Sequence, residues 1–323
     1  MQKLYPVLLR ADCKDYIWGS PKLKLEYNKE TNLESVAESW ELACRHDGMS
    51  KVLNGPYAGL SMAQYLRRVG DRVLGKKGQF FDKFPLLVKI LNADKDLSLQ
   101  VHPDAFFASQ FAGESSKNEF WYIAECKPGA TMVYGLKGVI GKEEFRQRIE
   151  DNTLMEVCNV VEVHKGDIFY VPAGTLHAIG AGIVVVEVQQ NANTTYRVYD
   201  YGRRDKNGNL RELHVEKALQ VTKLEKARGT GRRSNKVQQV GDAKVRKLIK
   251  CPYFTVYHVN LKGLCNLPIG LDSFQTITVT EGNVELTANE VSLELRKGNS
   301  VFLPAGLGEC RYSGTGEFIL SRL

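Results

Sequence analysis

The chain has 323 residues, of which 43% are hydrophobic and 25% are charged, as in ordinary globular proteins. Its first residues hold too short an apolar run for a signal peptide, and no stretch approaches the roughly 20 apolar residues that a membrane helix needs. These features argue against a protein that is anchored by a transmembrane helix. We therefore expect a cytoplasmic protein with no membrane partner.

The seven cysteines show no pattern of a redox or metal motif. They are scattered, their number is odd, and no two of them form a Cys-x-x-Cys pair. Disulfide frameworks and thiolate zinc sites need paired spacings. We therefore expect reduced, structural thiols at Cys13, Cys44, Cys126, Cys158, Cys251, Cys265 and Cys310.

The formal net charge of +7 is concentrated in one segment. Between Lys223 and Lys250, ten basic residues oppose two acidic residues, a net charge of +8, so the rest of the chain has a net charge of −1. The segment also contains three glycines and lacks aromatic residues. This composition is typical of a solvated connection, and we expect a basic linker rather than an arm that binds nucleic acid.

Three segments have the apolar spacing of a helix. Residues 60–75 carry a stripe of apolar side chains and end at Gly75, which is a stop signal. Further helices are predicted at 142–150 and at 215–219.

Most of the remaining sequence is typical of short strands separated by Gly, Pro or Asn. The first set of predicted strands comprises 84–92, 97–102, 120–125, 131–136, 167–171, 183–189 and 195–201. The second set comprises 253–261, 274–281, 283–287, 291–295, 300–303 and 318–321. This spacing is typical of antiparallel barrels or jelly rolls.

The second set of strands contains a copy of a segment from the first. Residues 165–177 align without gaps with residues 297–309, and the Lys-Gly and Pro-Ala-Gly positions coincide. His177 in the first copy corresponds to Glu309 in the second, and the second set has no Gln-x-His strand. We therefore expect a structural copy that does not bind metal.

Two candidate metal ligands share one face of the predicted strand at 97–102. Because side chains alternate along a strand, Gln100 and His102 point to one side while Leu99 and Val101 point to the other. The strand therefore presents an amide and an imidazole together in an otherwise apolar segment.

Two further candidate ligands lie at the ends of strand-like runs. Glu119 opens the run before Phe120, and His177 follows the Pro-Ala-Gly turn. Each residue by itself is more often structural, but two imidazoles, a carboxylate and an amide oxygen together suit an open divalent-metal site. The sequence therefore predicts a metal site formed by Gln100, His102, Glu119 and His177.

The same segments resemble the type I phosphomannose isomerases (mannose-6-phosphate isomerases), a family of zinc-dependent cupin proteins. The matching motifs have the same order and spacing and cover nearly the whole chain. They lie at 16–19, 38–41, 84–91, 97–104, 117–122, 171–179, 187–189 and 195–200. The chain has no long helical insertion, so it is similar to the short bacterial form.

The resemblance implies one zinc ion per chain, held by Gln100, His102, Glu119 and His177. It also implies Arg197 as the catalytic arginine, with Lys117 and Glu187 lining the substrate cavity. The implied substrates are mannose 6-phosphate and fructose 6-phosphate. Asn193 departs from the family, where this position is often Asp, and we assign it no catalytic role.

The strand pattern and the resemblance together predict the organisation of the chain. We expect a mainly β fold of two cupin-type antiparallel barrels, or jelly rolls, with a few short helices. The predicted parts are a catalytic metal-binding cupin domain at 1–222 with N-terminal strands and helices, a basic linker at 223–250, and a second, metal-free cupin-like domain at 251–323.

An aldose–ketose isomerase moves a proton between C2 and C1 through an enediol. It therefore needs a base, and it needs positive charge near the developing oxyanion, which a divalent ion and Arg197 can supply. The base is left open between Lys117, Glu187 and a water molecule on the metal. We also expect Thr195 and Tyr199 to share the cavity face with Arg197.

Two other functions fit part of the pattern. Two histidines and a carboxylate in a cupin also suit non-haem iron oxygenases, although Gln100 would fill a position that an oxygenase leaves open. A non-catalytic sugar-binding cupin is a further alternative, and four retained ligands together with Arg197 argue against it. Candidate cations for the substrate phosphate are Arg203, Arg204 and Lys89.

Overall fold

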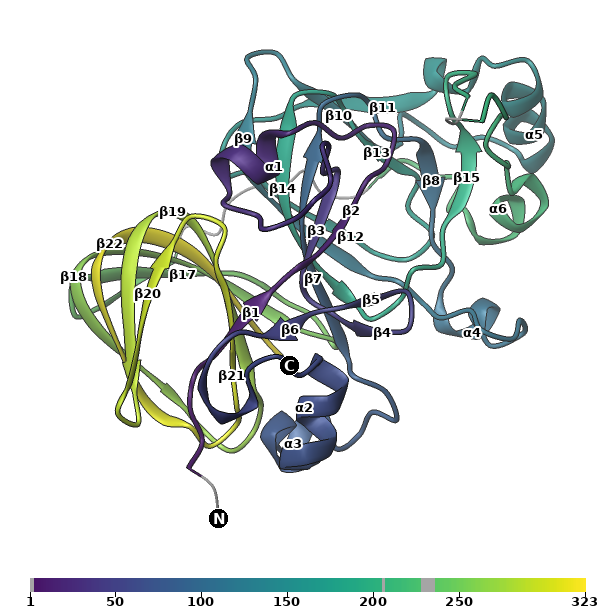
Figure 1. Ribbon diagram of the computed structural model, residues 1–323. Helices are drawn as coiled ribbons and strands as arrows, with labels where there is room; N and C mark the ends of the chain where they lie inside the picture. Colours follow the sequence, from purple (N-terminus) through teal and green to yellow (C-terminus); the bar gives the residue numbers. More distant parts are fainter. Residues whose placement is uncertain (1–2, 205–206, 228–235) are drawn as a thin grey trace. The chain divides into compact units, whose positions relative to one another are not determined.

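The computed structural model describes residues 3–204, 207–227 and 236–323 (Figure 1). The chain divides into two compact units. Unit 1 comprises Met1–Asp15, Pro21–Ile90 and Arg233–Leu323, and unit 2 comprises Tyr16–Ser20 and Leu91–Arg232. Each unit is therefore assembled from segments that are distant in the sequence.

Unit 1 contains a nine-stranded sheet with the order β16-β17-β18-β22-β19-β21-β1-β6, in which β20 also pairs with β19. The pairing is antiparallel, and the first strand of the chain, β1, lies beside β21.

The strands of unit 1, inside and outside this sheet, are β1 (Val7–Arg10), β2 (Asp12–Lys14), β3 (Glu38–Leu42), β4 (Cys44–Arg45), β5 (Gly48–Met49), β6 (Lys51–Val52), β16 (Val237–Val240), β17 (Ala243–Lys250), β18 (Thr255–Ile269), β19 (Gln275–Ala288), β20 (Val291–Arg296), β21 (Ser300–Leu303) and β22 (Gly308–Arg322). Its helices are α1 (Lys22–Glu26), α2 (Met62–Val69), α3 (Gly75–Gly78) and the 3-10 turns η1 (Gly55–Tyr57) and η2 (Asp71–Leu74).

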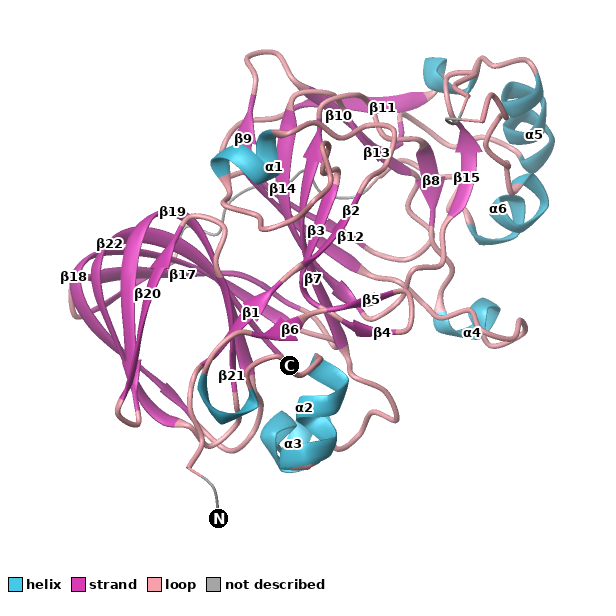
Figure 2. Cartoon of the chain, in the orientation of Figure 1, coloured by secondary structure: helices cyan, strands magenta, loops and turns pink. Residues whose placement is uncertain are grey.

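Unit 2 contains a five-stranded sheet with the order β11-β10-β13-β8-β15, and a second set of neighbouring strands, β12-β9-β14 (Figure 2). Its strands are β8 (Leu99–Val101), β9 (Glu119–Cys126), β10 (Thr131–Leu136), β11 (Cys158–Glu162), β12 (Ile168–Val171), β13 (His177–Ile179), β14 (Ile183–Gln190) and β15 (Tyr196–Tyr199). Its helices are α4 (Ala105–Ala108), α5 (Lys142–Glu150), α6 (Val215–Val221) and the 3-10 turn η3 (Leu154–Glu156). The boundary between the units falls within β7 (Leu86–Ala93).

Helices α5 and α6 close one face of the five-stranded sheet of unit 2. Phe145 of α5 and Leu219 of α6 belong to the same buried cluster as Val101, Val133 and Ala178 of the strands. Burying such side chains contributes roughly 1.5–3 kcal/mol each, which holds the helices on this face. The opposite face of the sheet is therefore the one that carries polar side chains toward β9 and β14.

The predicted secondary structure agrees with the structure in most segments and fails in one. Strand β10 and helix α5 have the predicted bounds, and the predicted pieces 274–281 and 283–287 form one long strand, β19. The helix predicted at 60–75 instead ends at Val69, because Gly70 adopts a φ of 84° that terminates it.

The segment at 223–250 is not simply a linker. Residues 237–250 contain the antiparallel strands β16 and β17, which extend the sheet of unit 1. Residues 228–235, which hold three of its arginines, lie outside the described residues. The grouping of the segments also differs from the predicted ranges, because β1 and β6 belong to the same sheet as β21. The functional domain ranges 1–222 and 251–323 stay predictions.

Two general properties follow from the described residues. Each of the seven cysteines carries a free thiol. Across residues 3–204, 207–227 and 236–323, none of the helices combines the length and the hydropathy that a membrane span requires.

A buried carboxylate of β3 pairs with Lys29 and binds β21 through a hydrogen bond inside unit 1. The Glu41 carboxylate lies 2.6 Å from the Lys29 ammonium, and both side chains are almost fully buried. Ser39 Oγ and Ser300 Oγ donate hydrogen bonds of 2.6 and 2.8 Å to the same carboxylate. Because a buried charge is tolerated only when it is paired and hydrogen-bonded, this carboxylate keeps Lys29 compatible with the interior.

Substitution of Glu41 should therefore be strongly destabilising. In Glu41→Ala the ammonium of Lys29 stays buried without its counter-ion, and we expect the free energy of unfolding in urea to fall by about 3–5 kcal/mol. Glu26→Ala is the matched control, since it breaks the exposed pair with Lys22 and should cost less than about 0.5 kcal/mol. A loss below about 1 kcal/mol for Glu41→Ala would contradict the role given to this carboxylate.

Candidate metal centre and active site

Three of the four predicted ligands meet in unit 2. His102 follows β8, Glu119 opens β9 and His177 opens β13, so the ligands come from both sets of strands. All three side chains are buried, and one ligand atom of each lies within 4.8 Å of the others. His102 Nε2 is 3.3 Å from Glu119 Oε1, and His177 Nε2 is 3.7 Å from Glu119 Oε2.

Backbone carbonyl groups orient both imidazoles. His102 Nδ1 lies 2.8 Å from the carbonyl oxygen of Thr194, and His177 Nδ1 lies 2.8 Å from that of Thr175. A carbonyl oxygen only accepts, so each Nδ1 carries the hydrogen and each Nε2 keeps its lone pair. Carbonyl partners of this kind orient the histidine ligands of metals in many proteins.

The electrostatics keep both imidazoles neutral and Glu119 ionised. Burial, reinforced by Lys117, lowers the pKa of His102 to about 3, and burial also lowers the pKa of His177. Burial alone would raise the pKa of Glu119, but the Lys117 ammonium beside it holds that pKa well below its usual value. Metal ions require neutral imidazole and ionised carboxylate, so the cluster already has the protonation states of ligands.

The donor set fits a divalent metal ion such as zinc. Within the described residues, Oε2 of Glu119 and Nε2 of His177 are buried without a hydrogen-bond partner. The Lys117 ammonium forms an ion pair with Glu119 and lies 3.3 Å from His102 Nε2, so a cation already lies against these atoms. Ligands of a tetrahedral zinc lie roughly 3.4 Å apart, which is close to the distances between these ligand atoms.

Strand register places Gln100 and Arg197 beside the cluster. Gln100 pairs with His177 across β8 and β13, and it pairs with Arg197 across β8 and β15. Residues directly opposite each other in antiparallel strands point to the same face. The side chains of Arg197, Gln100 and His177 therefore form one row on the face that carries the site.

Arg197 makes its hydrogen bonds to uncharged groups. Its Nε donates to Ser98 Oγ at 3.2 Å, and its Nη1 donates to the carbonyl oxygen of Glu212 at 2.9 Å. Burial, and then Arg211, lower the pKa of Arg197, but a guanidinium stays charged in proteins. The positive charge of Arg197 is therefore not consumed by a structural carboxylate.

The expectation that Tyr199 shares the face of Arg197 is wrong. A β-bulge between the two residues shifts the register, so that Tyr199 pairs with Leu99. Tyr199 packs on the apolar cluster under α5 and α6 instead. An extra residue in one strand reverses the alternation on which the expectation depended.

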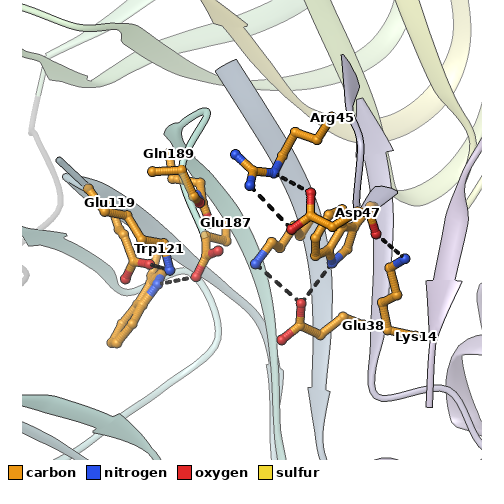
Figure 3. A network of polar contacts seen from close by, with 12 residues as sticks. Lys14, Glu38, Arg45, Asp47, Glu119, Trp121, Glu187 and Gln189 are labelled. Carbon is orange, nitrogen blue, oxygen red and sulfur yellow. Dashed lines mark hydrogen bonds and ion pairs between the residues drawn. The ribbon is translucent and has the colours of Figure 1, made fainter. Parts of the chain in front are cut away.

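Lys117 and Glu187, the two candidate bases, have different surroundings. The Lys117 ammonium pairs with Glu119 at the metal cluster. The Glu187 carboxylate is buried and accepts a 2.8 Å hydrogen bond from Trp121 Nε1 (Figure 3). Trp121 pairs with Glu187 across β9 and β14, and its ring lies edge-on at 5.3 Å from the ring of His177. The structure therefore brings both candidates to the site.

Asn118 has a structural role that the sequence did not indicate. Its Nδ2 donates to Gln190 Oε1 at 2.6 Å, and its Oδ1 accepts from the backbone N–H of Ala173 at 3.0 Å. These bonds join the start of β9 to the end of β14 and to the turn that precedes His177. The only signal in the sequence was its position directly before Glu119 in the Lys-Asn-Glu motif.

A cluster of arginines lies in the segment after β15. The buried Asp200 carboxylate forms ion pairs with Arg203 and Arg211. Burial would raise the pKa of Asp200, but the hydrogen bonds from both arginines hold it below its usual value. Arg197 interacts electrostatically with Arg203, Arg211 and the carboxylates of Asp200 and Glu212. Three guanidinium groups therefore oppose two carboxylates, and the cluster keeps a net positive charge. Asn193, by contrast, is exposed.

Comparisons with known proteins point to a single family. The family described as phosphomannose isomerase type I, catalytic domain, matches residues 7–128, and the family described as mannose-6-phosphate isomerase, cupin domain, matches residues 244–323. The mannose-6-phosphate isomerase ManA of Bacillus subtilis (strain 168) is 38% identical over 98% of this chain and 99% of its own length.

The chain is also similar to solved structures of mannose 6-phosphate isomerases. A crystal structure of the mannose 6-phosphate isomerase from Bacillus subtilis has a TM-score of 0.90 and 33% identity, covering 98% of this chain and 99% of its own. A mannose 6-phosphate isomerase crystallised with zinc and yttrium has a TM-score of 0.76 and 17% identity, covering 98% of each chain. At that identity the second likeness concerns the fold alone.

The two buried histidines should make the unfolding free energy of the metal-free protein depend on pH. In the unfolded chain a histidine has a pKa near 6.5, whereas the folded state depresses the pKa of His102 to about 3. The unfolded state therefore binds more protons between these limits. The stability that neutral burial provides is complete above pH 6.5 and is lost as the pH falls toward 3. We expect His102 alone to cost the chelator-treated protein about 2 kcal/mol of unfolding free energy between pH 7 and pH 5, and His177 to add to this loss.

Urea denaturation at several pH values measures this dependence. His102→Gln removes one titrating group and should reduce the slope. His164→Gln replaces an exposed histidine and should leave the slope unchanged. A stability that is constant between pH 7 and pH 5 would show that the histidines are not buried in neutral form.

Proposed function

The chain belongs to the type I mannose-6-phosphate isomerase family of enzymes, and from this premise we propose that it interconverts mannose 6-phosphate and fructose 6-phosphate through an enediol. The observation that carries the proposal is the buried cluster of His102, Glu119 and His177 beside Gln100 and Arg197. We further propose that the enzyme needs one zinc ion per chain at Gln100, His102, Glu119 and His177.

The choice of zinc has two supports. The ligand set combines nitrogen and oxygen donors at distances that suit zinc. A relative of the same fold crystallised with zinc. When bound, zinc supplies a Lewis acid for a substrate oxygen.

Arg197 is the residue that we propose to stabilise the oxyanion. As the substrate carbonyl becomes an enediolate, negative charge grows on an oxygen atom. A fixed guanidinium in a half-buried position stabilises that charge more than it stabilises the neutral substrate. Because Arg197 is hydrogen-bonded only to Ser98 and a carbonyl group in the contacts described above, its charge remains available.

We propose Glu187 as the base that moves the proton between C2 and C1. A carboxylate accepts a proton directly, whereas the Lys117 ammonium is already engaged in an ion pair with Glu119. The Trp121 indole fixes Glu187 with one hydrogen bond. We assign Lys117 to the cavity wall, where its charge keeps Glu119 ionised.

The substrate phosphate should lie near the arginines after β15. Arg203 and Arg211 form a positively charged pair around Asp200, and guanidinium groups bind phosphate in a bidentate manner. Lys89, by contrast, is buried in an ion pair with Glu38 in unit 1. The cytoplasmic location expected from the sequence stays a prediction.

The alternative functions are not favoured. The relatives that cover the whole chain are isomerases, and neither an oxygenase nor a sugar-binding cupin has a comparable observation behind it.

A coupled assay with mannose 6-phosphate tests the proposal. The purified protein should produce fructose 6-phosphate, and elemental analysis should find about one zinc per chain. Chelation should remove both the metal and the activity, and added zinc should restore both. Full activity without stoichiometric metal would refute the zinc requirement. A zinc-loaded protein that does not convert mannose 6-phosphate would refute the function.

Variants of the ligands serve as the matched comparison for this assay. His102→Ala and His177→Ala should each lose the metal together with the activity. Glu309→Ala changes the corresponding position of the second copy, and it should leave the metal content and the activity unchanged. Loss of metal from the Glu309 variant would place a second site in the C-terminal copy.

Arg197→Lys separates transition-state stabilisation from binding. The lysine keeps one positive charge but loses the planar fork, so kcat should fall at least about a hundredfold, equivalent to roughly 2.7 kcal/mol, while the metal content and folding stay intact. Steady-state kinetics give the result. A raised KM with a near-normal kcat would assign Arg197 to phosphate binding, and normal values of both would make it structural.

A further inference from the structure

The two polar atoms of the Gln189 side-chain amide differ in their hydrogen bonding. Within the described residues, Nε2 has partners and Oε1 has none. Gln189 Nε2 donates to the carbonyl oxygens of Gln190 and Ala192 at 2.8 and 2.6 Å. Both partners are acceptors, so the amide cannot be turned around, and Oε1 must point away from them. The side chain is fully buried, yet across the described residues no group donates to Oε1.

The position of Gln189 puts its side chain on the face that carries the active site. Gln189 pairs with Glu119 across β14 and β9, and Glu187, two residues earlier, pairs with Trp121. Opposite residues in antiparallel strands share a face, and so do residues two apart along a strand. Figure 3 shows Gln189, Glu187, Glu119 and Trp121 together on their two strands.

We propose that Gln189 is a substrate-binding residue whose Oε1 accepts a hydrogen bond from a non-reacting hydroxyl group of the sugar. This inference rests on the proposed isomerase function. A buried carbonyl oxygen without a donor is costly, and a sugar hydroxyl is a donor that would satisfy it when substrate binds. The adjacent Gln190 has a different task, because its Oε1 already accepts from Asn118.

This hydrogen bond would contribute to specificity. A site with a buried, pre-oriented acceptor discriminates against a ligand that lacks the matching hydroxyl, because the acceptor is then left unpaired. The hydroxyl groups at C3 and C4 of mannose 6-phosphate do not react. In the pyranose form they are the two candidates for the donor, because O5 is then the ring oxygen.

The test combines a variant with deoxy substrates. Gln189→Met keeps the length of the side chain but removes the acceptor. We measure kcat/KM of zinc-loaded wild type and variant with mannose 6-phosphate and with its 3-deoxy and 4-deoxy analogues. Wild type should lose about tenfold or more with one of the analogues. The variant should lose about tenfold with mannose 6-phosphate and no more than about twofold further with that same analogue.

The controls separate substrate binding from a structural role. The Gln189 side chain also holds the segment whose Thr194 carbonyl orients His102, so the zinc content and the melting temperature are measured for each variant. Gln275→Met replaces a buried glutamine of β19 in unit 1, and it should lose the same factor with the analogues as wild type does. If Gln189→Met does not fold, Gln189→Asn is used instead, because its shorter side chain moves the amide oxygen away from the sugar. The Asn variant should show the same reduced loss with the deoxy analogue.

Three results would overturn the inference. If kcat/KM of the variant falls with each analogue by the same factor as in wild type, Gln189 does not contact either hydroxyl. A normal kcat/KM of the variant would show that the acceptor is unimportant, and a loss of zinc would make Gln189 a support of the metal ligands. These three results leave the proposed function intact. Only a wild-type enzyme that does not isomerise mannose 6-phosphate would refute that function.

Discussion

The site depends on the charge of one buried carboxylate. Glu119 is almost fully buried between His102, His177 and Lys117, and an uncompensated anion in such a place would cost several kcal/mol. Because the two imidazoles are neutral, only the lysine balances the carboxylate, and within the described residues Glu119 Oε2 still lacks a hydrogen-bond donor. A bound divalent ion would resolve this deficit, so the feature that costs stability without metal would create affinity for metal.

The backbone, more than the side chains, fixes the shape of the site. The carbonyl oxygens of Thr194 and Thr175 hold the two histidines, while the ladders β8–β13 and β9–β14 place Gln100 beside His177 and Gln189 beside Glu119. Such contacts are insensitive to the identity of the side chains at those positions. They explain why a likeness in fold extends to relatives that share few residues with this chain.

The sequence predicted the members of the candidate metal site but not the residues that support them. Gln100, His102, Glu119 and His177 were found from alternation, turn position and resemblance, and the structure brings the last three together with Gln100 in register. Asn118 could not be found in this way, because its hydrogen bonds join segments that are distant in the sequence. The face of Tyr199 was predicted wrongly, since a bulge leaves no trace in the pattern of hydrophobic residues. The place of β1 beside β21 was likewise a long-range pairing that local patterns do not contain.

The repeated segment shows that the turn alone does not determine which side chains meet at the candidate metal site. Strands β12 and β21 begin at equivalent positions of the two copies, and Gly174 and Gly306 adopt nearly the same left-handed φ of 85° and 78°. In the first copy the next strand brings His177 opposite Gln100, whereas in the second it brings Glu309 opposite Pro268. The turn is therefore a folding device common to both copies. The chemistry depends on which side chain the neighbouring strand presents, and proline offers neither an imidazole nor an amide oxygen in its side chain.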